Sequence, residues 1–206
     1  MRKAVAADAQ SKNEEIFAHA VRVFKAKGYH AASMQDIADA VGLQKGSLYH
    51  YISSKDELLF KIFERGTGAL SKQLEEIIDS DDSPTNKLHR AIEAHLAALC
   101  DQLDIYTVYL SERRTFGGKL NSKVRAEGER HARLLERLIE QGIKSGDFRS
   151  VDVKMSAHAI LGMCNWLYQW YSPDGRLKPH EIAVIFSDMI LDGLANTSTR
   201  SRKTNK

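Results

Sequence analysis

Apolar residues recur at intervals of three and four along most of the chain, the spacing of one face of an α-helix. The stretch I-Y-T-V-Y-L at residues 105–110 is also typical of a strand, but no second strand-like run exists to pair with it, so we expect a helix there. The predicted fold class is therefore all-α. The expected helices cover about residues 11–27, 33–42, 44–52, 54–79, 84–103, 104–116, 121–145 and 151–171, with a last helix from Pro179.

Two short helices with a tight turn between them are predicted from Ser33 to Ile52. The Ser33 hydroxyl can accept from a free backbone N–H of the first helix, and Gly42 can take the left-handed conformation that often ends a helix. The second helix, from about Gln44 to Ile52, has a polar face suited to a DNA major groove. That face carries a cation, a phenol, an imidazole and a residue without a side chain: Lys45, Tyr49, His50 and Gly46.

Composition and charge narrow the classes of protein. The chain has 206 residues, 43% of them apolar, and a formal net charge of +3. No run of about 18 apolar residues is free of charge, and residues 1–10 lack the apolar centre of a signal peptide, so we expect a cytoplasmic protein. Residues 1–65 have only a slight excess of Lys and Arg, so charge alone does not predict nucleic-acid binding. Cys100 and Cys164 match no metal or redox spacing, and we expect reduced, buried thiols.

The segment I-A-D-A-V-G-L-Q-K-G-S-L-Y-H-Y-I-S-S-K-D-E-L, residues 37–58, closely resembles the N-terminal signature of the TetR family of transcriptional regulators. It departs from the family at Gln44, where Ser or Thr is usual as the helix cap, and at Ile52, where Phe is usual. The resemblance implies an N-terminal three-helix helix-turn-helix domain followed by a C-terminal helical ligand-binding and dimerisation domain. We place these at residues 1–54 and 55–196, joined by a helix that Ser54 can cap, with a basic flexible tail at residues 197–206.

The resemblance also implies which residues contact DNA. The side chains and backbone directed at base edges would be those of Gln35, Lys45, Gly46, Ser47, Tyr49 and His50. The residues that hold phosphates, fixing register without reading sequence, would be Ser33, Tyr51 and Lys55.

The last two predicted helices have more apolar surface than one neighbouring layer can cover. Two such antiparallel helices suggest a two-fold dimer built as a four-helix bundle, and the family resemblance implies the same arrangement. The residues expected at this interface are Ile160, Cys164, Leu167, Tyr171, Ile182, Ile185, Phe186 and Met189.

Aromatic residues and arginines in the central helices suggest an effector pocket, since guanidinium binds carboxylate and phosphate groups well. Residues 165–183 are also similar to TetR regulators of fatty-acid or steroid catabolism, which implies an acyl-CoA or a related effector. Aromatic residues at helical spacing are, however, more often part of a core than of a pocket. The proposed lining comprises Leu103, Tyr106, Tyr109, Leu110, Arg113, Arg114, Met163, Trp166 and Trp170.

These observations favour a ligand-responsive repressor that binds a palindromic operator as a dimer and is released by a small apolar or anionic effector. An enzyme is not expected, because the chain has no nucleophile elbow, phosphate loop or informative carboxylate pair. We expect no cofactor and no metal. The alternative is a helical ligand-binding or interaction protein that no longer reads DNA. The sequence leaves open the operator, the regulated genes, the effector, the direction of its effect and the number of dimers per operator.

Overall fold

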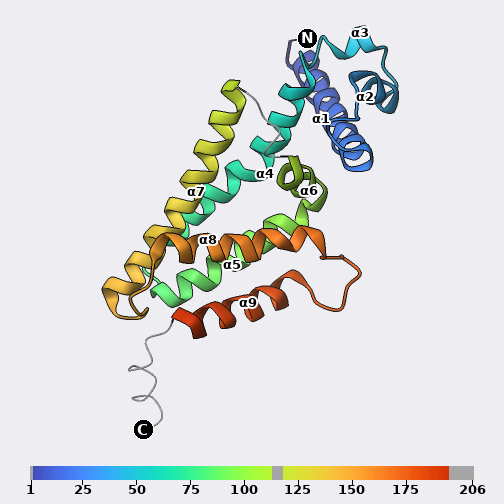
Figure 1. Cartoon of the computed structure of the whole chain (residues 1–206). Coiled ribbons are helices and arrows are strands. Elements are labelled where there is room, and N and C mark those ends of the chain that lie inside the picture. The colour runs from blue at the N-terminus through green and yellow to red at the C-terminus, as the bar shows by residue number, and fades with distance from the viewer. Residues whose placement is uncertain (1, 113–117, 195–206) are drawn as a thin grey trace. The chain divides into compact units, whose positions relative to one another are not determined.

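In the computed structural model, residues 2–112 and 118–194 are described, without the side chains of residues 2–10, 65–69 and 118–121. All regular elements within these ranges are helices, so the predicted all-α class is confirmed (Figure 1). They are α1 (Arg2–Lys27), α2 (Met34–Val41), α3 (Lys45–Leu48), α4 (Lys55–Ile78), α5 (Pro84–Asp101), α6 (Leu103–Glu112), α7 (Gly118–Ser145), α8 (Val153–Asn165), the 3₁₀ helix η1 (Trp166–Gln169) and α9 (Pro179–Leu194).

Three of these elements differ from the prediction. Helix α1 begins at Arg2 rather than near Ser11. Helix α3 ends at Leu48 rather than Ile52, because the next backbone bonds tighten into turns: the N–H of His50 donates to the Ser47 carbonyl at 3.2 Å. Helix α8 also ends early and continues as the tighter η1 turn. The ambiguous segment at residues 105–110 is helical, as predicted.

The chain forms two compact units. Unit 1 comprises Met1–Gly66 and Gln102–Val124, and unit 2 comprises Thr67–Asp101 and Arg125–Lys206. Helices α4 and α7 each contribute to both units. The division into domains at residues 54 and 55 stays a prediction, and the basic tail predicted at residues 197–206 lies outside the described residues.

The core of unit 1 holds α2 and α3 in place. Helix α1 packs against both α2 and α6, and α2 packs against α3. The two short helices are held by their apolar faces, since α2 buries four residues and α3 buries one. The principal core residues are Ile16, Ala20, Phe24, Ile37, Ala38, Leu48, Leu58, Leu59 and Ile62, each no more than 2% exposed.

Polar contacts connect α1 to α6 within unit 1. The ammonium of Lys25 lies 2.5 Å from the Asp104 carboxylate at the start of α6. The backbone N–H of Tyr29 donates to the Glu112 carboxylate at the end of α6, at 3.3 Å. The Tyr109 ring of α6 also packs on Phe63 of α4, with 5.0 Å between ring centres. Helix α6 is therefore tied to the DNA-binding module that the sequence predicts.

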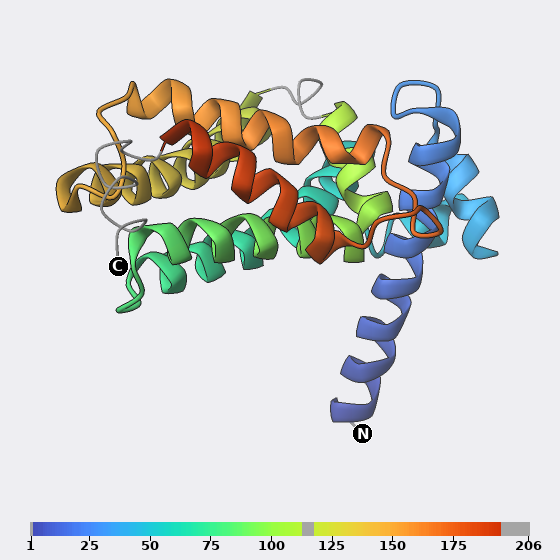
Figure 2. The same ribbon diagram turned by 90° about the horizontal axis from the view of Figure 1, so that it is seen from below.

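Helix α5 lies at the centre of unit 2. It contacts α8, η1 and α9, and α9 runs along it (Figure 2). Its predicted inner stripe is confirmed, since Leu88, Ile92, Leu96 and Leu99 are at most 1% exposed. The buried Lys87 donates its ammonium to the carbonyl of Ile78 at 2.8 Å and so satisfies the end of α4.

Candidate functional site

Helix α2 is capped at both ends as the sequence predicts. The Ser33 hydroxyl accepts from the N–H of Asp36 at 3.1 Å, and the Asp36 carboxylate accepts from the N–H of Ser33 at 2.8 Å. Gly42 ends the helix with φ at 73°. Contacts with Lys27 and Ser33 hold the pKa of Asp36 well below its usual range, so the cap is ionised at neutral pH. The orientation of α2 is thus fixed by local chemistry.

The N-terminus of α3 is capped less well than that of α2. Gln44 occupies the N-cap position with extended backbone, and its side chain makes no capping hydrogen bond. The departure from the usual Ser or Thr therefore leaves a backbone N–H of α3 without a side-chain acceptor at the cap.

The residues predicted to contact bases belong to α2, to α3 and to the turn that follows α3. Gln35, Lys45, Gly46, Tyr49 and His50 are exposed, and Ser47 is half-buried. Tyr49 is 46% exposed, and among the large apolar side chains described in unit 1 it alone is this open. A Cβ built on Gly46 meets no atom within 4 Å, so the fold itself does not require glycine there. Tyr49 is an exposed aromatic side chain, and Gly46 is a glycine that the fold does not require. Both features are typical of a surface that a partner approaches closely.

The residues predicted to hold phosphates have different surroundings. Ser33 is exposed, and Tyr51 is half-buried at the end of the turn after α3. Lys55 is half-buried and donates its ammonium to the carbonyls of Tyr29 at 2.7 Å and Ala32 at 2.8 Å. The Lys55 ammonium therefore already has hydrogen-bond acceptors within the chain. Its contact with a DNA phosphate stays a prediction.

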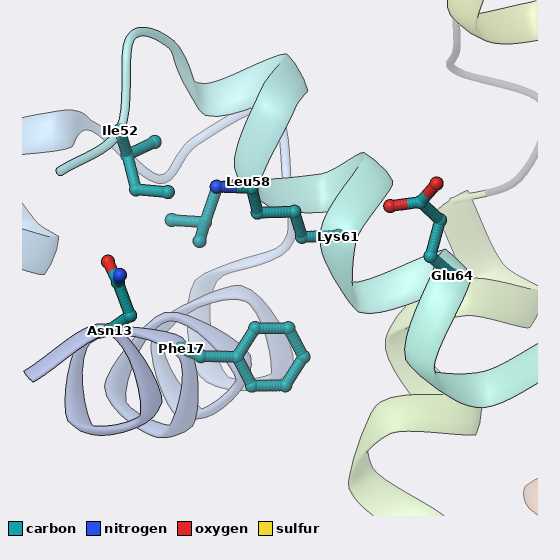
Figure 3. Close-up of a pocket in the computed structure, with 6 residues that line it drawn as sticks. All are labelled: Asn13, Phe17, Ile52, Leu58, Lys61 and Glu64. Atoms are coloured by element: carbon teal, nitrogen blue, oxygen red, sulfur yellow. The ribbon is translucent and has the colours of Figure 1, made fainter. Parts of the chain in front are cut away.

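Unit 1 also has a groove of about 260 Å³ between α1 and the start of α4 (Figure 3). Phe17, Ile52 and Leu58 provide apolar lining, and Lys61 and Glu64 of α4 provide polar lining. The groove contains none of the residues that the sequence singles out for DNA or effector contact.

The predicted effector residues fall in both units. Tyr106, Tyr109 and Leu110 are buried in unit 1, whereas Trp166 and Trp170 of unit 2 are 61% and 51% exposed. Leu103 and Met163 are half-buried. Arg113 and Arg114 lie outside the described residues. The pocket that these residues would form stays a prediction.

A cavity in unit 2 contains a polar pair that sequence reasoning missed. His95 of α5 and His131 of α7 line it, with 5.6 Å between their ring centres. His95 Nε2 lies 3.0 Å from Asn165 Oδ1, and His131 Nδ1 lies 3.2 Å from the Ser71 hydroxyl. Burial lowers the pKa of His95, and it lowers the pKa of His131 to about 3. Both imidazoles are therefore neutral at physiological pH.

The rest of this cavity is largely aliphatic. Its lining includes Leu74, Ile92, Leu135, Ile160 and Leu161, together with the Cys164 thiol, whose pKa burial raises to about 12. The cavity volume is about 10 Å³, close to the space that one water needs. Sequence spacing gave no signal for it, because its two histidines belong to different helices 36 positions apart.

The residues predicted for the dimer interface divide into two groups. Ile160, Cys164, Leu167 and Ile182 are at most 5% exposed within the chain itself, whereas Ile185 and Met189 of α9 are 44% and 64% exposed. Tyr171 and Phe186 are half-buried. The apolar side chains that remain open on α8, η1 and α9 are Met155, Trp166, Trp170, Val184, Ile185 and Met189.

Metal sites and membrane-spanning helices were also considered among the described residues. They contain no cluster of three or more His, Cys, Asp or Glu side chains that could hold a metal ion. None of the described helices has the length and apolar character needed to cross a membrane.

Comparisons with known proteins agree with this arrangement of helices. The family described as "Bacterial regulatory proteins, tetR family" matches residues 16–62, and the family described as "Tetracyclin repressor-like, C-terminal domain" matches residues 81–194. The repressor KstR2 of Rhodococcus jostii (strain RHA1) is 28% identical over 194 residues, covering 90% of this chain and 92% of KstR2.

Solved structures of the same kind also match. The TetR family regulator PfmR from Thermus thermophilus is 34% identical with a TM-score of 0.81, over 88% of this chain and 99% of PfmR. AibR in complex with isovaleryl coenzyme A and operator DNA is 29% identical with a TM-score of 0.78, over 86% of this chain and 97% of AibR. The chain therefore belongs to the TetR family of bacterial transcriptional regulators.

Proposed function

We propose that this chain is a repressor that binds a palindromic operator as a homodimer and leaves it when an acyl-CoA binds. The observation that carries the DNA-binding part is the exposure of most of the predicted base-contacting residues of α2, α3 and the turn after α3. Lys45, Tyr49 and His50 are exposed there beside Gly46, which the fold does not require. Lys45 can donate to guanine and Gln35 can pair with adenine in a major groove.

The dimer is supported by the open apolar side chains of α8, η1 and α9. Trp166, Trp170 and Met189 are each more than half exposed in a single chain. Several large exposed apolar side chains on neighbouring elements are typical of an interface, and a two-fold axis through it would present two DNA-binding surfaces. Two half-sites about one helical turn or somewhat more apart would fit such a dimer.

The effector class is supported by the relatives. AibR has been solved with isovaleryl coenzyme A and operator DNA, and another relative is the fatty acid metabolism regulator protein of Bacillus subtilis (strain 168), 24% identical over 187 residues. We infer that an acyl-CoA lowers the affinity for the operator.

The test begins with an operator selected from randomised duplex DNA, labelled for fluorescence anisotropy. Addition of butyryl-CoA, octanoyl-CoA and palmitoyl-CoA should release the protein with at least one chain length, whereas free coenzyme A should not. Lys45→Ala should weaken the specific site by about 1–3 kcal/mol and relax preference at one base pair. Equal operator binding in the presence and absence of every acyl-CoA would contradict the effector class. Failure to bind any DNA would favour a ligand carrier instead.

A further inference from the structure

Helix α2 carries an acidic side chain next to a residue that is predicted to contact a base. Asp39 is exposed and lies four positions after Gln35, so the two side chains are neighbours on the helix surface. DNA is a polyanion, and an exposed carboxylate at this place opposes its binding. Among the described residues, the hydrogen-bond partner of the Asp39 carboxylate is Gln35.

This contact determines which way the Gln35 amide is turned. Gln35 Nε2 donates to Asp39 Oδ1 at 2.7 Å. An ionised carboxylate only accepts hydrogen bonds, so the nitrogen of the amide, and not its oxygen, must face Asp39. Turning the amide over would replace a charge-assisted hydrogen bond by a contact between two acceptors. The carboxylate therefore favours one of the two orientations of the Gln35 amide.

Helix α2 holds this pair on a well-fixed backbone. The capping box of Ser33 and Asp36 ends the helix on one side, and Gly42 in the left-handed conformation ends it on the other. A different face of the helix is fastened to the core of unit 1 by its buried residues, which are Met34, Ile37, Ala38 and Val41. The position of Gln35 is thus set by α2, and the orientation of its amide is set by Asp39.

The favoured orientation leaves the groups that adenine requires. In the major groove adenine presents the N6 amino donor beside the N7 acceptor, and one amide can pair with both through its oxygen and one N–H. Gln35 Nε2 has two hydrogens, so one can bind Asp39 while the other, together with Oε1, remains for the base. Guanine presents two acceptors at the same places, and Oε1 would meet one of them with no hydrogen between.

We propose that Asp39 is a positioning residue for operator recognition, which holds the Gln35 amide in the orientation that selects adenine over guanine. The assignment rests on the proposed function, because it requires α2 to present Gln35 to a major groove. It deepens that function by identifying the residue that sets the base preference of Gln35. Asp39 acts through Gln35 and lowers the affinity for all DNA by repelling phosphates.

The experiment uses the full chain and an operator selected from randomised duplex DNA. Gln35→Ala removes the amide, and the base pair at which preference disappears identifies the Gln35 position. Affinities are then measured for operators that carry each base pair at that position. Wild type should favour adenine over guanine there by about tenfold, within the range of one bidentate contact.

Two substitutions of Asp39 separate positioning from charge. Asp39→Ala removes the acceptor, so the preference for adenine over guanine should fall to about twofold or less. Asp39→Asn removes the charge and keeps an oxygen acceptor, so most of the preference should remain. Both variants should bind DNA of random sequence more tightly than wild type, by a similar factor. The control Glu64→Ala, which removes an exposed carboxylate from α4, should keep the full preference.

Several results would overturn the proposal. One is an adenine preference that survives in Asp39→Ala, and another is an equal loss in Asp39→Asn, since charge alone would then be responsible. A base other than adenine at the Gln35 position is a third. Alanine suits a helix, and circular dichroism checks the fold. If Asp39→Ala does not fold, Asp39→Met, which also lacks an acceptor, decides in the same way.

The outcomes also separate this role from the proposed function. If wild type enriches no palindrome, the repressor proposal is wrong, and the role of Asp39 is wrong with it. If wild type enriches a palindrome and Gln35→Ala changes no base preference, the repressor proposal holds and the role of Asp39 is wrong.

Discussion

The ammonium of Lys55 donates to the carbonyl of Tyr29 at 2.7 Å and lies 4.3 Å from the centre of the same residue's ring. Ala32 provides a second carbonyl at 2.8 Å. The Tyr29 hydroxyl in turn donates to the Asp56 carboxylate. Lys55 at the start of α4 therefore holds the loop between α1 and α2 through two carbonyls and one ring.

Replacement of Lys55 should destabilise unit 1. Lys55→Met keeps an unbranched apolar stem but removes the cation, leaving part-buried carbonyls without their donor. Hydrogen bonds to a charged group typically contribute about 1.5–3 kcal/mol, and we expect a loss of that order in the free energy of unfolding, measured with urea. The control Lys61→Met removes an ion pair with Glu57 at 3.1 Å, which should cost under about 1 kcal/mol.

The same variant tests the predicted phosphate contact of Lys55. If Lys55 also binds a phosphate, the dependence of DNA affinity on salt should become less steep by about one unit on a double-logarithmic plot. An unchanged salt dependence with lowered stability would restrict Lys55 to its internal role.

Gly46→Ala should separate stability from DNA binding. The added methyl meets no atom of the protein, and alanine is favoured over glycine in a helix by about 0.8–1 kcal/mol. Stability should therefore stay equal or rise. Operator affinity should fall roughly tenfold or more, the scale of one lost base contact, if the backbone of α3 approaches the DNA.

The matched control is Gly128→Ala on α7, where an added methyl also meets nothing. It should leave operator affinity unchanged. A Gly46→Ala protein that binds the operator like the wild type would remove Gly46 from the DNA surface.

Stability should fall as the pH is lowered, because the histidines of the unit 2 cavity are buried without charge. The pKa of His131 is about 3 when folded, against an ordinary value of 6.5, and that of His95 is also lowered. Between these values the unfolded chain binds more protons, so this stability is complete above about pH 6.5 and is lost as the pH falls toward 3. Each histidine can contribute a slope of up to about 1.4 kcal/mol per pH unit.

Urea unfolding at pH 7.5 and pH 5.5 measures this slope in a range where most carboxylates stay ionised. The pKa of Glu57, which Ser53 lowers to about 2, lies far outside that range. His131→Phe should reduce the loss of stability on acidification, whereas His158→Gln should not. Equal slopes for wild type and His131→Phe would mean that the surroundings of His131 do not lower its pKa.

A charge placed on the exposed face of α9 should abolish dimerisation. Met189 is 64% exposed, and Met189→Glu would put a carboxylate into an apolar interface. We expect a monomer by analytical ultracentrifugation and loss of specific operator binding, with helix content unchanged. Lys144→Glu on the exposed surface of α7 should remain dimeric. A dimeric Met189→Glu protein would place the interface elsewhere.

The sequence predicted best what local chemistry decides. Ser33 and Gly42 were assigned as the caps of α2 from residue type alone, and the structure has both. The end of α3 was predicted four residues too late, because Tyr51 and Ile52 continue the apolar spacing while the backbone turns after Leu48. Periodicity records which side chains face inward, and a tight turn can satisfy the same pattern.

The cavity of unit 2 could not be predicted from local sequence patterns. His95 and His131 lie on α5 and α7, and only the packing of unit 2 brings their rings within 5.6 Å. The aromatic residues that drew attention instead, Trp166 and Trp170, are more than half exposed in the single chain.

The most direct test of a dimeric operator-binding repressor is selection of bound fragments from randomised duplex DNA, at moderate salt and without effector. It should be run with wild type and Gly46→Ala in parallel. Wild type should enrich a palindrome with half-sites about one helical turn or somewhat more apart, ~34–36 Å or longer, and Gly46→Ala should do so weakly or not at all. A folded, dimeric wild-type protein that enriches no sequence would contradict the assignment as a dimeric operator-binding repressor.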